Sequence, residues 1–389
     1  MICGEEEITM HEKLAYAIKH YPWVQRLYRV VMSFLFQVWG MFTGFDDHLI
    51  LFSAMSGDQY AGSPRVLFEA MKKDPRFSDY HYVWAFTHPE KQTVEGASVV
   101  KMDSPQYFKT ALRAKIWITD VNIERGLNFK KKKTVYLNTW HGTGPKKGGN
   151  AVAGRKDYDF SRVDIFCCDG QYTHDIFIKW FNATDESMLW CGRPREDELM
   201  AFTESDREKI RSELEIPEHV KAVLYMPTWR EGQLQGLNYA AWEKKLGKDY
   251  CLIVRAHHFT KEGLLSEHSS EFVKDVSDYP DVNKLYLAAD YLISDYSSAF
   301  FDYGLLAKPM ICFAPDYDTY KQNYGLFMDL ESEFPNGVFK NEDDVLNLIQ
   351  NMNYKEESAK CGAYCAGYVT HKENATQKCL NRVLELVKK

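Results

Sequence analysis

Four clusters of polar and reactive residues each follow directly after an apolar, strand-like run. They are Trp140-His141-Gly142-Thr143, Pro227-Thr228-Trp229-Arg230, Arg255-Ala256-His257-His258 and Ser294-Asp295-Tyr296-Ser297-Ser298. In open parallel sheets, ligands bind outside the carboxyl ends of the strands, which is where these clusters would lie. Histidines exchange protons near neutral pH, and arginines bind phosphate. The placement therefore predicts a single ligand site assembled from several strand ends.

The first cluster opens a glycine-rich basic loop, within "VYLNTWHGTGPKKGGN" at 135–150. Glycine and proline exclude helix and strand, so a mobile loop carrying His141, Lys146 and Lys147 is expected. An ordinary surface turn with solvated lysines is one interpretation, and a loop that approaches an anion is the other. Neither the P-loop pattern nor G-x-G-x-x-G can be written through this segment, so it predicts no standard nucleotide loop.

The fourth cluster continues as "SDYSSAFFDYG", whose apolar residues predict a helix beginning at the serines. Ser297 and Ser298 could simply cap that helix, or they could hold a phosphate at its N-terminus. Asp302, within the first turns, could accept hydrogen bonds from a ribose or polyol, or it could complement the helix dipole. Asp295 is expected to orient its neighbours.

The third cluster, "VRAHHF", ends a predicted strand. Because side chains alternate along a strand, Arg255 and His257 should face one ligand and His258 should face the other way. No HExxH pattern or carboxylate cluster accompanies the histidines, so no metal site is expected here. With His141 to take a proton from an alcohol, the whole set suits phosphoryl or glycosyl transfer from an activated nucleotide.

The composition describes a globular protein of two domains. The chain has 389 residues, 45% of them hydrophobic, and a formal net charge of −7, which argues against a general nucleic-acid binder. Its nine cysteines include no CxxC pair, so they are expected to be reduced and mostly buried. A zinc site built from Cys361, Cys365 and His371 is a minor alternative.

Alternating apolar runs and helix patterns predict the fold class. From about residue 46, strands such as "HLILFSAM" and "KIWITDV" alternate with helices, two of which begin at Ser63-Pro64 and Ser104-Pro105. The charged segment "TESDREKIRSELEIPEH" interrupts the pattern, which then restarts. We therefore expect an α/β protein of two Rossmann-like doubly wound domains, at 46–205 and 206–389.

The first 45 residues predict an amphipathic helical segment. Apolar residues recur at helical spacing between Leu14 and Val38, with Lys13, Lys19, Arg26 and Arg29 among them. The uncharged run 30–42 is too short to cross a bilayer. The segment could lie on an anionic membrane surface or pack on the protein's own core. The sequence alone does not separate these alternatives, and the family resemblance described below favours the membrane surface.

Five motifs in order resemble the CDP-glycerol glycerophosphotransferase family of teichoic acid and capsule synthesis. They are "NTWHGTGPKK", "GRPREDEL", "MPTWRE", "VRAHHF" and "ISDYSSAFFDY", within a similarity from about Leu51 to the C-terminus. The resemblance implies a GT-B-like fold and transfer of glycerol phosphate or ribitol phosphate from a CDP-activated donor, with CMP leaving. It also implies a lipid-linked or polymeric acceptor, such as an undecaprenyl-linked saccharide, at the cytoplasmic face of the membrane. No cofactor and no nucleic acid are expected.

The family's site residues transfer to particular positions of this chain. His141 matches the candidate general base, and His257 matches a second essential histidine. Donor contacts are implied for Trp140, Gly142, Thr143, Gly144, Arg195, Pro227, Thr228, Arg255, Ala256, Ser297, Ser298 and Asp302, with Lys146, Lys147 and Asp295 in support.

Two departures from the family pattern and two rival functions remain at this stage. Gly144 stands where family members usually have proline, which favours a more mobile loop, and only "KENATQK" represents the acidic-glycine element near the C-terminus. The short chain favours a primase-like enzyme or a compact polymerase. The rivals are a GT-B glycosyltransferase that uses a nucleotide sugar and a catalytically silent membrane-associated binding protein.

Overall fold

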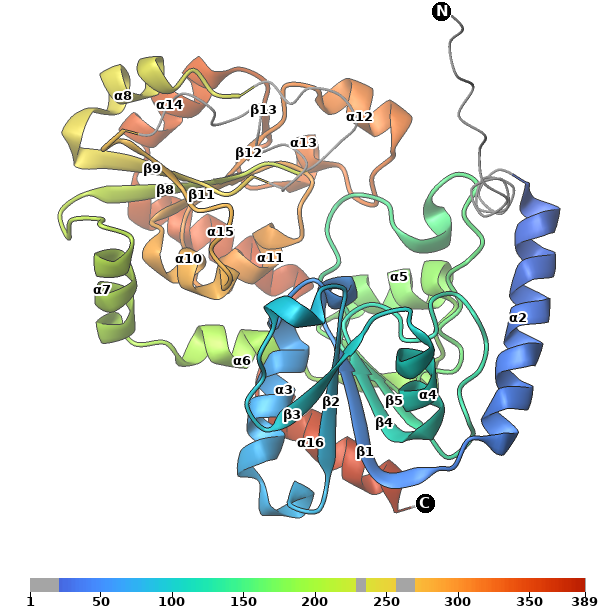
Figure 1. Ribbon diagram of the computed structural model, residues 1–389. Helices are drawn as coiled ribbons and strands as arrows, with labels where there is room; N and C mark the ends of the chain where they lie inside the picture. Colours follow the sequence, from blue (N-terminus) through green and yellow to red (C-terminus); the bar gives the residue numbers. More distant parts are fainter. Residues whose placement is uncertain (1–20, 229–235, 257–269, 389) are drawn as a thin grey trace, which may run out of the picture.

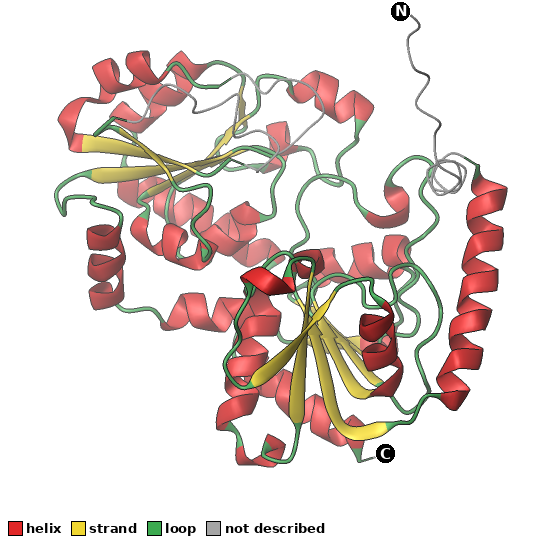
Figure 2. Cartoon of the chain, in the orientation of Figure 1, coloured by secondary structure: helices red, strands yellow, loops and turns green. Residues whose placement is uncertain are grey.

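The computed structural model describes residues 21–228, 236–256 and 270–388. Two parallel sheets lie side by side, each with helices on both faces (Figures 1 and 2). The first has the strand order β3-β2-β1-β4-β5-β6-β7 and the second the order β10-β9-β8-β11-β12-β13, and every strand pair is parallel. Both orders reverse direction once, between β1 and β4 and between β8 and β11. This confirms the predicted pair of doubly wound domains.

The first domain forms from the expected strand and helix patterns. Its strands are β1 (Asp46–Ser53), β2 (His81–Phe86), β3 (Ala97–Lys101), β4 (Ala114–Thr119), β5 (Val135–Asn138), β6 (Ile165–Cys168) and β7 (Met188–Trp190). Its helices are α2 (Pro22–Phe42), α3 (Gly62–Lys73), α4 (Pro105–Arg113), α5 (Gln171–Phe181) and α6 (Pro194–Ala201).

The second domain follows through the charged helix α7 (Glu204–Glu213), as the sequence predicted for the boundary. Its strands are β8 (Lys221–Met226), β9 (Tyr250–Val254), β10 (Val273–Asp275), β11 (Tyr291–Ser294), β12 (Met310–Phe313) and β13 (Val338–Phe339). Its helices are α8 (Tyr239–Leu246), α10 (Val282–Ala288), α11 (Ala299–Gly304), α12 (Tyr317–Asn323), α13 (Leu330–Glu333), α14 (Glu342–Asn351) and α15 (Tyr354–Tyr368).

Successive residues of a strand point to opposite faces of the sheet, and both faces are buried in apolar cores. In β1, Ile50 and Phe52 pack in one apolar cluster, and Leu49 and Leu51 pack in the cluster on the other face. The second sheet divides in the same way, with Leu224 on one side and its neighbours on the other. A strand buried on both faces has little room for polar residues, so polar chemistry is confined to the strand ends.

The last helix, α16 (Ala375–Val387), returns to the first domain (Figure 1). Its residues Ala375, Cys379, Leu380 and Val383 are buried in the apolar cluster that contains Ile50 of β1. The structure thus differs from the expectation that 206–389 forms one domain. The connecting segment crosses near residue 370, where the N–H groups of Thr370 and His371 donate to the Asp169 carbonyl at 2.8 and 2.9 Å.

The two predicted serine caps have different outcomes. Ser104 caps α4, its hydroxyl accepting from the Tyr107 N–H at 3.2 Å, as expected. Ser63 does not cap α3, because the helix begins at Gly62 and Ala61 occupies the cap position. Its buried hydroxyl instead accepts from the Arg195 N–H at 3.3 Å, which links α3 to α6.

Helix α2 packs one face on the first domain and leaves the other exposed. Phe36 is 9% exposed and lies 4.5 Å, ring centroid to ring centroid, from Phe108 of α4. On the opposite face Trp23, Phe34 and Phe42 are 70%, 63% and 84% exposed. Within the described residues no helix has the length and apolar character to cross a membrane. Residues 1–20 of the expected amphipathic segment lie outside the described part of the chain.

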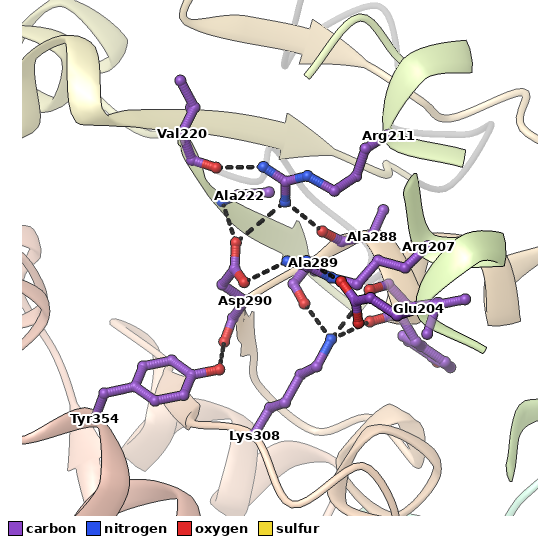
Figure 3. Close-up of polar contacts among 12 residues, drawn as sticks. Glu204, Arg207, Arg211, Val220, Ala222, Ala288, Ala289, Asp290, Lys308 and Tyr354 are labelled. Carbon is purple, nitrogen blue, oxygen red and sulfur yellow. Dashed lines mark hydrogen bonds and ion pairs between the residues drawn. The ribbon is translucent and has the colours of Figure 1, made fainter. Parts of the chain in front are cut away.

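A charged network fixes the start of the second sheet (Figure 3). Asp290, before β11, forms ion pairs with Arg207 at 2.7 Å and Arg211 at 3.3 Å, and it accepts the Ala222 N–H at 2.8 Å. Lys308 donates to the Ala289 carbonyl at 2.6 Å and the Leu287 carbonyl at 3.0 Å, satisfying the end of α10. These contacts hold α7, α10, β8 and β11 in register from the end opposite the ligand edge.

We expect Asp290→Asn to destabilise the second domain by about 3 kcal/mol, because it leaves the buried Arg211 guanidinium without its carboxylate. The matched control is Glu204→Gln, which removes an exposed partner of Arg207 and should cost less than about 1 kcal/mol. Urea unfolding followed by tryptophan fluorescence measures both. Equal midpoints for the two variants would show that the network does not stabilise the sheet.

Candidate active site

A cleft of about 820 Å³ lies between the two domains, where the carboxyl ends of both sheets meet. Six of the predicted site residues line it: His141, Arg195, Arg255, Ser297, Ser298 and Asp302. They come from four separate segments of the chain. The strand-end argument from the sequence brought His141, Arg255 and the 297–302 segment to one site, and the family resemblance added Arg195. The structure also adds a wall on the first domain, formed by Met55, Gln59, Tyr60, Gly62 and Arg65.

His141 follows β5 and faces the cleft with a defined tautomer. Its Nδ1 lies 2.9 Å from the Asp120 carbonyl oxygen, which can only accept, so Nδ1 carries the proton and Nε2 keeps its lone pair. The residue reaches solvent in the cleft, yet protein atoms surround the ring. The pKa of His141 is lowered to about 4, because desolvation and the charges of Arg195 and Lys146 together outweigh the hydrogen bond to Asp120. A neutral imidazole with a free Nε2 can accept a proton.

Asp120, at the end of β4, is a functional candidate that the sequence reasoning missed. Besides holding His141 through its carbonyl, it accepts the Met55 N–H on its buried carboxylate at 2.9 Å. Burial raises the pKa of Asp120 to about 7, opposed by that hydrogen bond and by the charge of Arg195. Its position directly after the "KIWIT" strand was the signal available, because β4 adjoins the switch point of the sheet.

Arg195 and Asp302 form a buried ion pair across the cleft. One guanidinium nitrogen of Arg195 in α6 lies 2.7 and 3.0 Å from the two carboxylate oxygens of Asp302 in α11. The side chains are 6% and 8% exposed. Asn283 of α10 donates to the Arg195 carbonyl at 2.9 Å, so both ends of Arg195 contact the second domain. Asp302, predicted to meet a ribose or polyol, is thus already paired with Arg195 in this structure.

The glycines of the first cluster allow the backbones of the two domains to touch. A Cβ on Gly144 would lie 2.7 Å from the Ser298 backbone nitrogen, and one on Gly142 would lie 2.4 Å from the Ser298 hydroxyl. Gly142 also has a φ of +131°, which disfavours other residues. The glycine positions are therefore explained by close approach of the two domains.

The basic part of this loop is hydrogen-bonded to the second domain. The Phe327 N–H donates to the Pro145 carbonyl at 2.7 Å, and the Lys147 N–H donates to the Gly325 carbonyl at 3.1 Å. Lys146 forms an isolated antiparallel bridge with Leu326. Burial lowers the pKa of Lys146, against the attraction of Asp295. The predicted mobile loop is thus an ordered contact between the domains, which carries the Lys146 cation beside the cleft.

The second-domain clusters are organised by Asp295, as expected. Its carboxylate accepts the Thr228 N–H at 2.9 Å and the Tyr296 N–H at 2.7 Å, so it joins the ends of β8 and β11. Ser297 accepts the Ala299 N–H at 3.1 Å, whereas Ser298 makes no side-chain cap. Ser298 is therefore available to a ligand in the cleft.

Arg255 carries a positive charge into the cleft from the end of β9. Burial lowers the pKa of its guanidinium, and its Nη1 atom is buried without a hydrogen-bond partner in the described residues. The neighbouring Ala256 is buried and its N–H donates to Ser277 at 3.0 Å, which fixes the strand end. His257, predicted as the partner of Arg255, lies outside the described residues, as does Arg230. A buried unpaired guanidinium in a cleft is suited to an anionic ligand.

Several residues that were predicted to contact the donor do not line the cleft. Trp140 is buried, and its ring packs 4.7 Å from that of Phe181 in an aromatic core. Thr143 is also buried, and its hydroxyl has no partner among the described residues. Lys147 is exposed. Thr228, directly after Pro227, positions the β8 end through its hydrogen bond to Asp295. These residues set the geometry of their neighbours.

The one cluster of metal-ligating side chains found in the described ranges lies elsewhere, in the core beneath α16. Cys167, Cys191 and Cys379 are fully buried, and the sulfur atoms of Cys167 and Cys379 are 3.4 Å apart. The eight cysteines of the described residues are all free and buried, as the sequence predicted. Cys361 and Cys365 pack in the second-domain core and form no such cluster with His371.

Comparison with known proteins places the chain in a family. The sequence profile of the CDP-glycerol:poly(glycerophosphate) glycerophosphotransferases matches residues 33–387. The chain therefore belongs to this family, which confirms the resemblance inferred from the five motifs.

Relatives with known names are similar over most of this chain. A teichoic acid glycerol-phosphate transferase of Staphylococcus aureus is 31% identical over 79% of this chain and 85% of its own length. A teichoic acid poly(glycerol phosphate) polymerase of Bacillus spizizenii is 27% identical over 91% and 96%. A polymerase of the same description from Staphylococcus epidermidis is 31% identical over 78% of this chain, which spans about 45% of that relative's length.

A solved structure shows the same fold. A variant of the wall teichoic acid polymerase TagF superimposes with a TM-score of 0.82 at 27% identity, covering 94% of this chain and 96% of the other. A TagF variant soaked with CDPG is equally similar, with a TM-score of 0.82 at 28% identity. The GT-B-like fold expected from the resemblance is confirmed.

We expect the His141 imidazole to titrate with a midpoint near pH 4 and to be the Nδ1–H tautomer when neutral, because burial and cations oppose its charge. Nitrogen-15 NMR of histidine-labelled protein measures both, and the resonance missing from His141→Asn supplies the assignment. A midpoint near the ordinary 6.5, or an Nε2–H tautomer, would contradict this description of the site.

Proposed function

We propose that the protein transfers glycerol phosphate, or ribitol phosphate, from a CDP-activated donor to a hydroxyl of a lipid-linked or polymeric acceptor. The observation that carries the proposal is the His141 imidazole, whose Nε2 faces a cleft that also contains Ser298 and the Arg255 guanidinium, whose Nη1 has no partner among the described residues. Family membership and the teichoic acid enzymes among its relatives support the same reaction.

The proposed step is a displacement at the donor's polyol-bearing phosphorus. The acceptor oxygen forms a bond to that phosphorus as its proton passes to Nε2 of His141. The phosphoanhydride bond breaks, and CMP leaves with the bonding electron pair. Catalysis of this kind depends mainly on position and charge, which Arg255, Lys146 and the backbone at Ser298 provide.

Donor binding should adjust the basicity of His141. In the free protein, the charges of Arg195, Lys146 and Arg193 lower its pKa. A bound diphosphate would bring negative charge next to the same cations and so raise the pKa of His141 toward the working pH. His141 is thus neutral in the free protein and becomes a stronger proton acceptor when the donor is bound.

We further propose that the reaction requires no resident cofactor, because cations of the chain face the site where a diphosphate would lie. Transfer should then continue in the presence of excess EDTA. Loss of activity with EDTA, restored by Mg²⁺, would show that a divalent ion shares this task.

The exposed face of α2 supports an additional proposal, that the protein lies on the cytoplasmic surface of the membrane. Leu27, Phe34, Leu35 and Met41 are 56%, 63%, 51% and 74% exposed, an apolar area that water solvates poorly. Arg26 and Arg29 on the same helix would attract anionic lipid. This location would bring the cleft to a lipid-linked acceptor.

The first experiment measures CMP release from CDP-glycerol and from CDP-ribitol, with and without a lipid-linked acceptor. We expect acceptor-dependent release with one of the donors and a fall of about a thousandfold in His141→Ala, since general-base catalysis contributes about that much. His219→Ala, which changes an exposed histidine before β8, at the end of the second sheet opposite the cleft, should leave the rate unchanged. Turnover of nucleotide sugars with no use of either CDP-polyol would favour the glycosyltransferase alternative.

A glycine pair tests whether the domain contact positions the site. Gly144→Ala places a Cβ 2.7 Å from the Ser298 nitrogen, so the domains must separate and kcat/KM for CMP release should fall about a hundredfold. Gly148→Ala is the matched control, because its Cβ would meet only Phe181 at 3.7 Å, an ordinary contact. Similar rates for the two variants would show that close approach at Gly144 is not required.

A further inference from the structure

A second cavity lies away from the cleft, between α2 and the loops that follow β4 and β5. Its volume is about 410 Å³, which suits a small head group. Three arginines line it, Arg26 and Arg29 from α2 and Arg162 from the segment before β6. Val30 and Phe34 of α2 line it too, and they are 62% and 63% exposed. The cavity therefore joins a cationic interior to the exposed apolar face of α2.

The three arginines differ in the partners that their guanidinium groups have within the protein. Arg162 pairs with Glu124. Arg29 is held by two backbone carbonyls, those of Gly126 at 3.0 Å and Lys156 at 3.4 Å, and no carboxylate of the described residues pairs with it. Arg26, one turn earlier, has no hydrogen-bond or ion-pair partner in the described part of the chain. Arg29 is thus a cation fixed in place, and Arg26 is a cation free to close on a ligand.

Two aspartates also line the cavity and must be included in its charge. Asp159 is engaged, since its carboxylate accepts from the Ser161 hydroxyl at 2.7 Å and from the Asn182 amide at 2.7 Å. Asp157 is half-buried, and its carboxylate has no partner among the described residues. A site with arginines and one available carboxylate suits a phosphate monoester, because the arginines bind its anionic oxygens and the carboxylate can accept from its remaining P–OH group.

We propose that this cavity binds the phosphate head group of a membrane lipid whose hydrocarbon part lies along the exposed face of α2. The inference rests on the proposed membrane location of α2 and extends it from general attraction to a defined head-group site. Asn122 also lines the cavity, two residues beyond Asp120, whose carbonyl orients His141. The lipid phosphate would therefore be bound at the same edge of the first sheet as the candidate base.

The test compares vesicles of phosphatidylcholine containing either phosphatidic acid or phosphatidylserine, matched for zeta potential. General electrostatic attraction predicts equal binding, whereas a head-group site predicts tighter binding to phosphatidic acid. Arg26→Gln should weaken that binding about fivefold and remove the preference. Arg26 has no partner to lose among the described residues, so folding should be unaffected, and Arg29→Gln is the second variant. Lys133→Gln, an exposed charge outside the cavity, is the matched control and should keep the preference.

Calorimetry with short-chain phosphatidic acid below its micelle concentration tests the site without a membrane, and the arginine variants should not bind it. Equal binding of both vesicle types, or unchanged preference in both arginine variants, would overturn the proposal. Equally tight binding of inorganic phosphate would also overturn it, by assigning the cavity to a soluble anion. CMP release by Arg26→Gln with a soluble polyol-phosphate acceptor should equal wild type, so loss of the head-group site and loss of the transferase function are separable.

Discussion

The cleft depends on a contact between two backbones that is possible only because residues 142 and 144 are glycines. Across this contact, His141 from the first sheet and the ends of β9 and β11 from the second come to face one ligand volume. Any side chain at Gly144 would meet main-chain atoms of Ser297 and Ser298, which cannot rotate away as a flexible side chain could. The spacing of the base from the opposing cations is therefore set by van der Waals contact between backbones.

The buried pair of Arg195 and Asp302 determines the orientation of that contact. Moving two charges out of water is unfavourable, and a buried ion pair seldom adds much net stability. Its geometric requirement is strict, however, because separating the partners would leave each charge buried alone. Since Arg195 also receives a hydrogen bond at its carbonyl from Asn283, α6 has little freedom relative to α10 and α11. The pair therefore favours one relative placement of the domains, and its cation also helps to keep His141 neutral.

Sequence reasoning succeeded where the cause was local. Two-sided apolar runs such as "LILF" specify buried parallel strands, and the polar residues that interrupt them mark strand ends, so five of the six predicted cleft residues follow from the residue pattern, and Arg195 follows from the family resemblance. It failed where the partner is distant in the chain. Ser63 looked like a helix cap but meets Arg195, Asp302 looked free but is paired, and α16 packs on a sheet that begins more than three hundred residues earlier. No periodicity or spacing encodes such pairings.

Helix α2 shows why two interpretations that seemed opposed in the sequence were compatible. The sequence placed apolar residues around most of its circumference, and a domain surface can cover only one side of a helix. Phe36 and Trp39 pack on the domain from that side. The other apolar residues of α2 are exposed, because the helix has more apolar surface than one interface can bury. Packing on the core and exposing apolar side chains are thus properties of opposite faces of one helix. Because the covered face fixes α2 to the first domain, whatever the open face contacts is held at a set position relative to β4 and β5. Because of this rigid connection, a lipid bound at the surface of α2 would lie at a fixed distance from the His141 base.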